Sequence, residues 1–216
     1  MQGRNALLKI YEILNGHYGN LRWWPADSPF EVVVGAILTQ NTTWRSVERA
    51  ISNLKSRNLL DPKRLSATQD DILYGLIRPS SYYRVKTKRL KAFLFFLNDQ
   101  FGGDLDSLFS EDPWPLRKKL LTVKGIGEET ADSILLYAGQ KAVFVIDAYT
   151  RRILERHTII SGDVPYADIQ RLFMDRLPRS APLFNQYHAL LVNTGKEFCL
   201  KKNPFCSRCP LSGFLK

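Results

Sequence analysis

The stretch Leu121-Thr122-Val123-Lys124-Gly125-Ile126-Gly127-Glu128-Glu129-Thr130-Ala131 decides the fold of this chain. The apolar residues that follow its two glycines recur at i, i+3, i+4 and i+7, at Ala131, Ile134, Leu135 and Ala138. This spacing is typical of an amphipathic helix. Apolar residues before the turn predict another helix, marked by Trp114, Leu116, Leu120 and Leu121. We therefore predict two helices over about residues 114–138, joined by a tight glycine turn.

A turn of this kind presents backbone N–H groups to a ligand. The turn amides and the N-terminus of the second helix can meet a phosphate. We expect glycine at Gly125 and Gly127 because a side chain would block the approach of the backbone and would disfavour positive φ.

Helical periodicity extends over most of the chain. Asp27-Ser28-Pro29 is a helix start, with a capping residue before a proline in the first turn. Apolar spacing predicts further helices over residues 47–54, 72–77, 88–98, 146–154 and 166–177, and residues 187–191 open a last long helix. Residues 143–146 are β-branched and aromatic but isolated, so we interpret them as a buried connection. The prediction is an all-α protein.

The charge balance indicates the class of partner. The 216 residues carry a net charge of +10, which points to nucleic acid or an anionic membrane surface. No apolar run approaches the roughly 20 residues of a membrane span, and the positive charges are dispersed over several segments, so a membrane partner is disfavoured. The first residues are not followed by an apolar signal region, which predicts a cytoplasmic protein.

Asp147 follows Ala138 by nine residues, and three cysteines lie near the C-terminus. With the hairpin, these features resemble the endonuclease III (helix-hairpin-helix, HhH-GPD) superfamily of DNA glycosylases over about residues 25–210. The resemblance implies two helical subdomains with a DNA-binding cleft between them. It places a helical barrel at residues 29–138 and a second subdomain at residues 1–28 plus 139–216. It also implies a monomer that binds double-stranded DNA with a damaged base.

Asp147 is the expected catalytic residue. Breaking an N-glycosidic bond develops positive charge on the sugar, which a carboxylate stabilises, and the carboxylate can also orient or deprotonate the attacking water. Aspartate before a helix is also a common N-cap, and both roles are compatible.

Glu129 occupies the hairpin position where bifunctional members hold a lysine that attacks the sugar and forms a Schiff base. Glutamate cannot form that imine, and Lys124 lies on the other side of the turn. The resemblance thus implies a monofunctional glycosylase that leaves an abasic site. Glu128 and Glu129 also suit the positive end of the second helix.

Trp24-Pro25 and residues 38–42 and 78–83 look like the 3-methyladenine glycosylase branch of this superfamily. The resemblance implies a pocket for a flipped base built from Trp24, Pro25 and Trp44, with Lys196 lining the cleft. Aromatic faces favour a cationic alkylated purine. The alternative for each tryptophan, Trp23 included, is a place in the core.

The resemblance also implies DNA contacts outside the pocket. Asn41, or its neighbour Gln40, would fill the space of the flipped base, although asparagine also suits a helix C-cap. Phosphate contacts are expected at Gly125, Gly127, Thr130, Lys88 and Arg151. Lys88 belongs to a basic run with Lys86, Arg89 and Lys91, which alone would be a solvated helix face. Of Arg151 and Arg152, one is expected to contact DNA and the other to pair internally.

The spacing of Cys199, Cys206 and Cys209 resembles the iron–sulfur loop of endonuclease III, in which a fourth cysteine falls at the position of Leu215. Four cysteines are the usual ligands of a [4Fe–4S] cluster. Three thiolates leave several options open: a cluster with another ligand, a labile cluster, zinc with a histidine such as His188, or no metal. A cluster would order the basic loop that carries Lys201, Lys202 and Arg208, and it would not take part in the chemistry.

The leading hypothesis is a base excision repair enzyme that removes an alkylated purine such as 3-methyladenine. A mismatch or oxidised-base glycosylase with lyase activity is the enzymatic alternative, which Glu129 disfavours. A non-catalytic helix-hairpin-helix module is the second alternative, and Asp147 argues against it.

Overall fold

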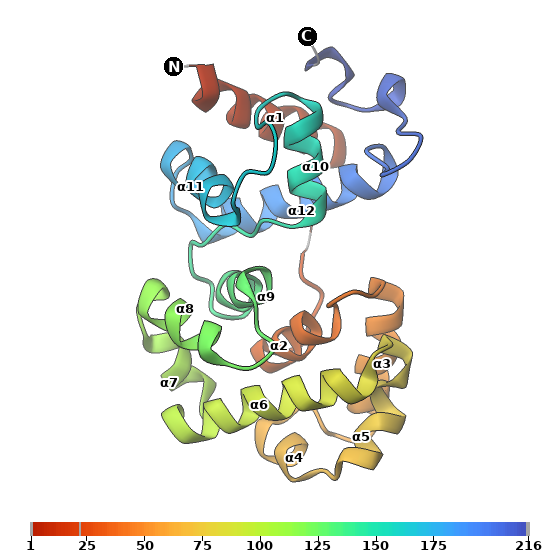
Figure 1. Ribbon diagram of the computed structural model, residues 1–216, viewed down its shortest axis with the longest axis vertical. Coiled ribbons are helices and arrows are strands. Elements are labelled where there is room, and N and C mark those ends of the chain that lie inside the picture. The colour runs from red at the N-terminus through yellow and green to blue at the C-terminus, as the bar shows by residue number, and fades with distance from the viewer. Residues whose placement is uncertain (1, 22, 215–216) are drawn as a thin grey trace. The chain divides into compact units, whose positions relative to one another are not determined.

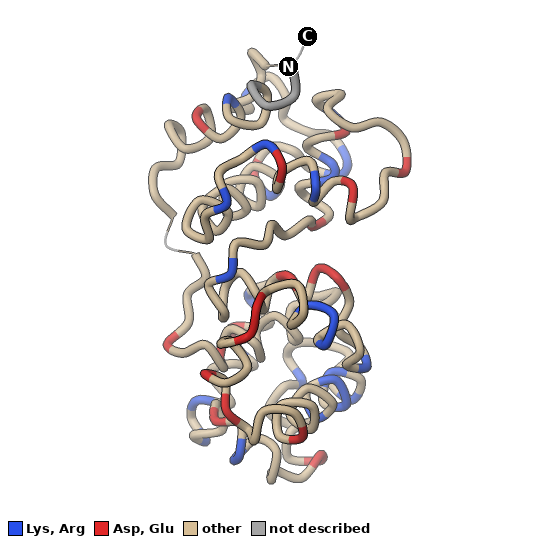
Figure 2. The backbone as a smooth tube through the Cα atoms, turned by 90° about the vertical axis from the view of Figure 1, so that its left-hand side faces the viewer, with Lys and Arg blue, Asp and Glu red and all other residues tan. Residues whose placement is uncertain are grey.

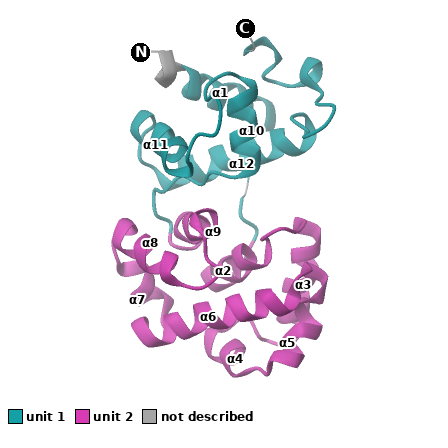
Figure 3. Ribbon diagram, in the orientation of Figure 1, with its two compact units in different colours: residues 1–25, 140–216 teal, residues 26–139 magenta. Residues whose placement is uncertain are grey.

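The computed structural model describes residues 2–21 and 23–214, and all regular secondary structure in that part of the chain is helical (Figure 1). The predicted fold class is confirmed. The chain divides into two compact units, one of residues 1–25 and 140–216 and the other of residues 26–139 (Figure 3). The sequence prediction puts the corresponding boundaries after residues 28 and 138.

The unit of residues 26–139 is built around α2. Its helical segments are α2 (Pro29–Leu38), α3 (Trp44–Lys55), α4 (Pro62–Ala67), α5 (Asp70–Ile77), η1 (Arg78–Ser80), α6 (Tyr83–Phe101), α7 (Leu105–Ser110), α8 (Pro113–Thr122), α9 (Glu128–Ser133) and a π-helical continuation, η2 (Ile134–Ala138). Every residue of α2 after Pro29 is buried, because α3, α6, α9 and η2 pack around this helix. The predicted cap is present, since the Glu31 amide donates to Ser28 Oγ over 3.2 Å.

The other unit is built around α12. It contains α1 (Gln2–Tyr18), α10 (Ala148–Arg156), α11 (Tyr166–Arg176), α12 (Ala181–Glu197), η3 (Cys206–Arg208) and η4 (Ser212–Phe214). Helices α1 and α10 both pack on α12. The core includes stacked rings of Phe144 and Phe173, with Tyr187 edge-on to both. None of the described helices is both long and apolar enough to cross a membrane.

Residues 143–146 are the predicted buried connection, and this prediction is confirmed because all four are buried. Side chains of α11 satisfy its backbone in place of a neighbouring strand. Gln170 Nε2 donates to the Phe144 carbonyl over 2.7 Å, and the Ile146 amide donates to Tyr166 Oη over 3.2 Å. Buried backbone groups need such partners, and these two fix the chain directly before Asp147.

Two helix starts differ from the prediction. Ile146 lies outside α10, because Asp147 caps that helix and its backbone is extended. The last helix begins at Ala181 rather than near Tyr187. Its cap is Ser180, whose Oγ accepts from the Leu183 amide over 3.4 Å, and Pro182 lies in its first turn. This start repeats the serine-and-proline signature of α2, a signal that the apolar spacing alone does not reveal.

Candidate functional site

The predicted hairpin is formed by α8, the turn at residues 123–127 and α9. A buried ion pair joins its two helices: Arg117 Nε donates to Asp132 Oδ1 over 2.6 Å, and Arg117 Nη2 donates to Oδ2 over 3.0 Å. Asp132 is fully buried. Val123 and Ile126 are also buried and hold the turn against the protein, whereas Gly125 and Gly127 are exposed. The ion pair therefore joins the two helices of the hairpin, and the glycine turn between them is exposed.

The two turn glycines are required for different reasons. Gly125 has a φ of +90°, and a Cβ there would lie 2.4 Å from Arg89 Cγ. Gly127 has a φ of −95°, and a Cβ there would meet nothing within 4 Å. The expectation of positive φ therefore holds for Gly125 and is wrong for Gly127. Nothing in the described protein demands glycine at position 127, which leaves close approach of a ligand as its physical rationale.

Gln40 braces this turn. Its Nε2 donates to the Gly125 carbonyl over 3.0 Å and to Thr130 Oγ1 over 2.8 Å. Its Oε1 accepts from Arg89 Nη1. Asn41, in contrast, is exposed and has a φ of +52°. The two candidates for the wedge are thus separated, because the Gln40 side chain is engaged in the hairpin and Asn41 faces solvent.

The first turn of α9 carries the other hairpin residues. The first intrahelical bond runs from the Ala131 amide to the Gly127 carbonyl, so the amides of residues 128–130 come before it and face the N-terminal end. Thr130 is buried, and its hydroxyl oxygen accepts from Gln40 Nε2, so a phosphate contact of Thr130 stays a prediction. Glu129 is exposed in the same turn.

Most of the basic run on α6 is used internally. Lys86 is buried, and its Nζ donates to the carbonyls of Leu38, over 2.8 Å, and of Ser80. Burial and, to a smaller extent, the Arg89 charge lower the pKa of Lys86 to about 8. Lys91 Nζ donates to three carbonyls at the end of α4, those of Leu65, Ser66 and Thr68. Lys88 is the one residue of the run that is exposed, so the hypothesis of phosphate contact now concerns this residue.

Asp147 has a defined geometry at the start of α10. Its Oδ1 accepts from the Thr150 amide over 2.7 Å, so the N-cap interpretation is correct. Its Oδ2 lies 3.7 Å from Nε2 of His188, and only 11% of the Asp147 side chain is exposed. One carboxylate oxygen is thus held by the helix while the other faces an imidazole.

His188 is the partner that sequence reasoning missed. It lies on α12 and is buried at 6% exposure. Burial lowers the pKa of His188, the Asp147 carboxylate raises it and the Lys196 charge lowers it, with a net lowering. The ring is therefore neutral near pH 7, although an adjacent carboxylate would ordinarily protonate it. The suggestion that His188 completes a zinc site is wrong, because its ring lies beside Asp147.

Close packing of α10 on α12 holds the two residues together. A Cβ at Gly195 would lie 2.4 Å from Tyr149 Cδ1, so the tyrosine ring rests directly on the helix backbone. Arg152 lies over the Tyr149 ring and donates to the carbonyls of Gly195, over 3.1 Å, and of Cys199, over 2.6 Å. Arg151 Nη1 also donates internally, to the Val164 carbonyl over 2.6 Å. Both arginines therefore have internal partners, and a DNA contact of Arg151 stays a prediction.

The aromatic residues are only partly placed together. Lys196 Nζ lies 5.4 Å from the centre of the Trp23 ring, which in turn lies edge-on to Trp24. Both tryptophans and Trp44 are half-buried, and Pro25 is exposed. The structure thus joins Lys196 to Trp23, which is not among the residues predicted for the base pocket.

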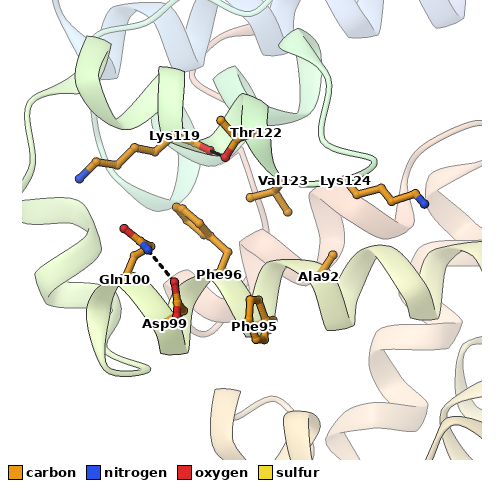
Figure 4. A pocket seen from close by; sticks show the side chains of 9 residues that line it. All are labelled: Ala92, Phe95, Phe96, Asp99, Gln100, Lys119, Thr122, Val123 and Lys124. Atoms are coloured by element: carbon orange, nitrogen blue, oxygen red, sulfur yellow. Dashed lines mark hydrogen bonds between the residues drawn. The ribbon is translucent and has the colours of Figure 1, made fainter.

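A cavity of about 510 Å³ lies between α6 and the end of α8 (Figure 4). Phe95, Phe96 and Val123 form its apolar wall, and Lys119 and Lys124 lie at its sides. None of the residues predicted for the base pocket lines it. The cavity is therefore not the predicted base pocket.

The three cysteines line a second cavity, of about 150 Å³, together with His157 and Arg156. Burial raises the pKa of the Cys209 thiol, and the neighbouring Cys199 and Cys206 contribute in the same direction. No three His, Cys, Asp or Glu side chains of the described residues are grouped closely enough to hold a metal ion in this arrangement. Leu215, the position of a fourth cysteine, lies outside the described residues. The donors suit a thiolate-preferring metal, but the Cys₄ set of an iron–sulfur cluster is incomplete.

Positive charge is spread over several elements of both units (Figure 2). This distribution agrees with the net charge of +10 and suits a long polyanion.

Residues 34–179 match the model of the HhH-GPD superfamily of base excision DNA repair proteins. The chain belongs to this superfamily. As an HhH-GPD protein it is a DNA glycosylase of base excision repair, and DNA is its partner.

Individual relatives agree with the HhH-GPD assignment. A protein of Methanocaldococcus jannaschii, provisionally named a DNA repair glycosylase, is 44% identical over 96% of this chain and 94% of its own length. An endonuclease III of Sulfolobus acidocaldarius is 29% identical over 87% of this chain and 81% of its own. The crystal structure of H. pylori 3-methyladenine DNA glycosylase bound to 1,N6-ethenoadenine has a TM-score of 0.78 and 26% identity, covering 91% of this chain and 98% of that one.

The predicted site residues of this HhH-GPD protein are divided between its two units. The unit around α2 carries Gln40, Asn41, Trp44, Lys88, Gly125, Gly127, Glu129 and Thr130. The unit around α12 carries Trp24, Pro25, Asp147, Arg151, Lys196 and the three cysteines. Within each unit the structure adds residues that the sequence did not single out for these sites: Arg117 and Asp132 in the first, His157 in the second.

Proposed function

We propose that this protein is a monofunctional DNA glycosylase that removes an alkylated purine, such as 3-methyladenine, and leaves an abasic site. The observation that carries the proposal is the geometry of Asp147. One oxygen of this carboxylate accepts from the Thr150 amide, and the other lies 3.7 Å from a buried His188 ring. The group is therefore held in place and has one oxygen turned toward a neutral neighbour.

This geometry suits stabilisation of a sugar cation. As the glycosidic bond breaks, positive charge develops on the sugar, and a carboxylate held in advance lowers the energy of that state without having to reorganise. A neutral His188 leaves the negative charge of Asp147 uncompensated, whereas a protonated ring would offset it. The same carboxylate can orient or deprotonate the attacking water.

Glu129 supports hydrolysis without strand cleavage. It occupies the exposed first turn of α9, at the position where lyase-active members of the superfamily present an amine. A carboxylate cannot form the Schiff base that leads to strand cleavage. The product of this reaction is then an intact strand with an abasic site.

The substrate class rests on aromatic residues and on one relative. Trp24, Pro25, Trp44 and Lys196 are proposed to hold the flipped base, and tryptophan faces attract the positive charge of an alkylated purine. The H. pylori relative is a 3-methyladenine DNA glycosylase that binds an adenine derivative. Such lesions already have a weakened glycosidic bond, so modest catalytic groups suffice.

DNA is proposed to be bound by a monomer through the hairpin and its neighbours. The exposed turn at Gly125 and Gly127 and the amides of residues 128–130 would meet one phosphate, and Lys88 and Arg151 would meet others. Asn41 would enter the duplex in place of the flipped base. A [4Fe–4S] cluster at the three cysteines would order the loop that carries Lys201, Lys202 and Arg208.

The decisive test is to incubate the purified protein with alkylated duplex DNA and to measure free base and strand breaks, with half of each sample treated with alkali. We expect release of 3-methyladenine and breaks only after alkali. Asp147→Asn should lower release by at least about 10²-fold while duplex binding persists. Release by the variant at the wild-type rate would remove Asp147 from the mechanism.

An endonuclease III-like activity is the second candidate, favoured by the 29% identical Sulfolobus relative. It predicts strand breaks without alkali and a covalent adduct that borohydride traps. Such an adduct from the wild-type protein would contradict the monofunctional assignment. Glu129→Lys, which places an amine in the same turn, is the positive control for trapping.

A further inference from the structure

We propose that Lys86 is a positioning residue that fixes the backbone of Asn41 for entry into the duplex. Its ammonium group ties the loop that carries Asn41, residues 39–43, to a second loop, residues 81–82. The inference deepens the proposed function, because it rests on Asn41 as the side chain that fills the space of the flipped base. It does not depend on which base is removed.

Lys86 joins two segments that are distant in sequence. Its side chain is buried, and its Nζ donates to the carbonyl of Leu38, over 2.8 Å, and to the carbonyl of Ser80. Leu38 is the last residue of α2 and Ser80 is the last residue of η1, so each loop starts directly after a carbonyl that Lys86 holds. Two oxygens that accept from one nitrogen lie at most about 6 Å apart. The two loops therefore begin side by side.

The backbone of both loops adopts disfavoured conformations. Asn41, Ser81 and Tyr82 have φ values of +52°, +59° and +45°. Residues other than glycine keep such conformations only where the surrounding structure holds them, and they gather at ligand-binding sites. The pKa of Lys86, lowered mainly by burial, is about 8, so near pH 7 the donor still carries its charge. Hydrogen bonds from a charged donor are the stronger kind, and these two hold the start of each loop.

A second contact fixes the chain directly before Asn41. Gln40 Nε2 donates to the Gly125 carbonyl over 3.0 Å, and Gln40 Oε1 accepts from Arg89 Nη1. Arg89 lies one helical turn after Lys86 on α6, so one helix braces this loop at two points. The Asn41 side chain itself is exposed. A side chain whose backbone is fixed in advance loses less conformational entropy on binding, so these contacts favour entry of Asn41 into the duplex.

The test measures how the full-length protein distinguishes a duplex with a vacant position from an intact duplex. Two labelled duplexes of the same sequence are used at pH 7, one fully paired and one with a stable abasic-site analogue. Fluorescence anisotropy gives the affinity for each, and the selectivity is the ratio of the two affinities. The abasic analogue has no base to release, so a wrong assignment of the substrate does not affect this measurement.

The wild type is compared with Lys86→Met, Asn41→Ala, the double variant and Lys91→Met. Lys91→Met is the matched control, because Lys91 lies on the same helix and donates to three carbonyls at the end of α4. Its loss removes the same charge and the same kind of brace at a different place. Lys86→Gln keeps a neutral donor and replaces Lys86→Met if that variant does not fold. Denaturant unfolding establishes that each variant is folded.

We expect the wild type to prefer the abasic duplex, and Lys86→Met and Asn41→Ala each to lower this selectivity by about five- to tenfold. The double variant should be no less selective than Asn41→Ala, because a positioning residue acts only through the residue that it positions. Lys91→Met should lose stability but keep the wild-type selectivity.

Four results would overturn the proposal: a wild type without selectivity, a folded Lys86 variant with wild-type selectivity, additive losses in the double variant, or an equal loss in Lys91→Met. Failure of the proposed function gives a different result. A protein that shows the expected coupling between Lys86 and Asn41 but releases no 3-methyladenine would keep the role of Lys86 and remove the proposed substrate.

Discussion

Gly125 and Gly127 lie two residues apart, but only Gly125 is required by the protein itself. Gly125→Ala would force a strained φ and a clash with Arg89, so we expect a loss of about 1–3 kcal/mol in the free energy of unfolding. Gly127→Ala meets open space and should cost under about 1 kcal/mol, since glycine is only moderately better than alanine as a cap. Denaturant unfolding of both variants measures these values.

The same pair tests the phosphate site. If the turn meets a phosphate, Gly127→Ala should weaken duplex binding by about tenfold at low salt, because the added methyl group keeps the backbone from the phosphate. Fluorescence anisotropy with labelled duplex provides the measurement. Unchanged affinity in a stable variant would argue that DNA does not approach this turn.

Gln40 and Asn41 are neighbours with opposite expected effects. Gln40→Ala removes the brace between Arg89 and the turn, so unfolding should become easier by about 1–3 kcal/mol. Asn41→Ala removes an exposed side chain but leaves alanine at a φ of +52°, which asparagine adopts more readily, so we expect a loss of about 1 kcal/mol or less. Base release should instead fall in Asn41→Ala if this residue fills the vacated space. Wild-type release rates on matched duplexes would exclude the wedge role.

At the scale of elements, the ion pair between α8 and α9 should dominate the stability of the hairpin. Asp132→Ala leaves the Arg117 guanidinium without its buried partner, and we expect a loss of about 3–5 kcal/mol. Glu128→Ala is the matched control, because its carboxylate contacts the same arginine over 3.4 Å but is exposed. It should cost under about 1 kcal/mol. Equal effects of the two variants, measured by chemical denaturation, would contradict this assignment.

Two lysines of α6 donate hydrogen bonds to backbone carbonyls at the C-terminal ends of other helices. Lys86 lies under the C-terminal ends of α2 and η1, and Lys91 lies under that of α4. A cation suits these carbonyl-rich ends. The run that looks like a solvated basic face is therefore largely a set of internal braces, which leaves Lys88 for DNA.

At the scale of the whole molecule, buried titratable groups set the dependence of stability on pH. The pKa of His188 is lowered on folding, so below its ordinary value the unfolded chain binds a proton that the folded protein does not. The free energy of unfolding should then decrease as the pH falls below about 6.5. His188→Asn should show a smaller decrease, as measured by denaturant unfolding between about pH 7.5 and 5. Parallel profiles for the two proteins would refute the assignment.

Lys86 should change the free energy of unfolding at alkaline pH. Its pKa is about 8 in the folded protein against an ordinary value of 10.5, so between these two pH values the unfolded chain binds a proton that the folded protein does not. By the same linkage, the free energy of unfolding should rise with pH between about 8 and 10.5. Lys86→Met should lack this rise. Wild-type and variant profiles with equal slopes above pH 8 would show that the Lys86 charge is not suppressed by burial.

The sequence by itself determined the helical class, the hairpin, the cap role of Asp147 and the superfamily. These follow from spacing within one segment, such as Ala131 and Ile134 on one helix face, or from short signatures such as Ser28-Pro29, so no distant residue is needed to recognise them. Apolar spacing alone misplaced two helix starts, because it runs back past the Asp147 cap to Ile146 in one case and becomes regular only near Tyr187 in the other. The hydrogen bonds of Asp147 and Ser180 define both boundaries.

Only the tertiary structure decided which side chains meet. His188 lies beside Asp147, Gln40 braces a turn 85 residues away, and His157 joins three cysteines. No local pattern reports such partners, because helix packing brings together residues whose separation in sequence is arbitrary. The position of Lys86 has the same explanation. A basic run predicts an exposed side chain, and only packing against the ends of two other helices buries it.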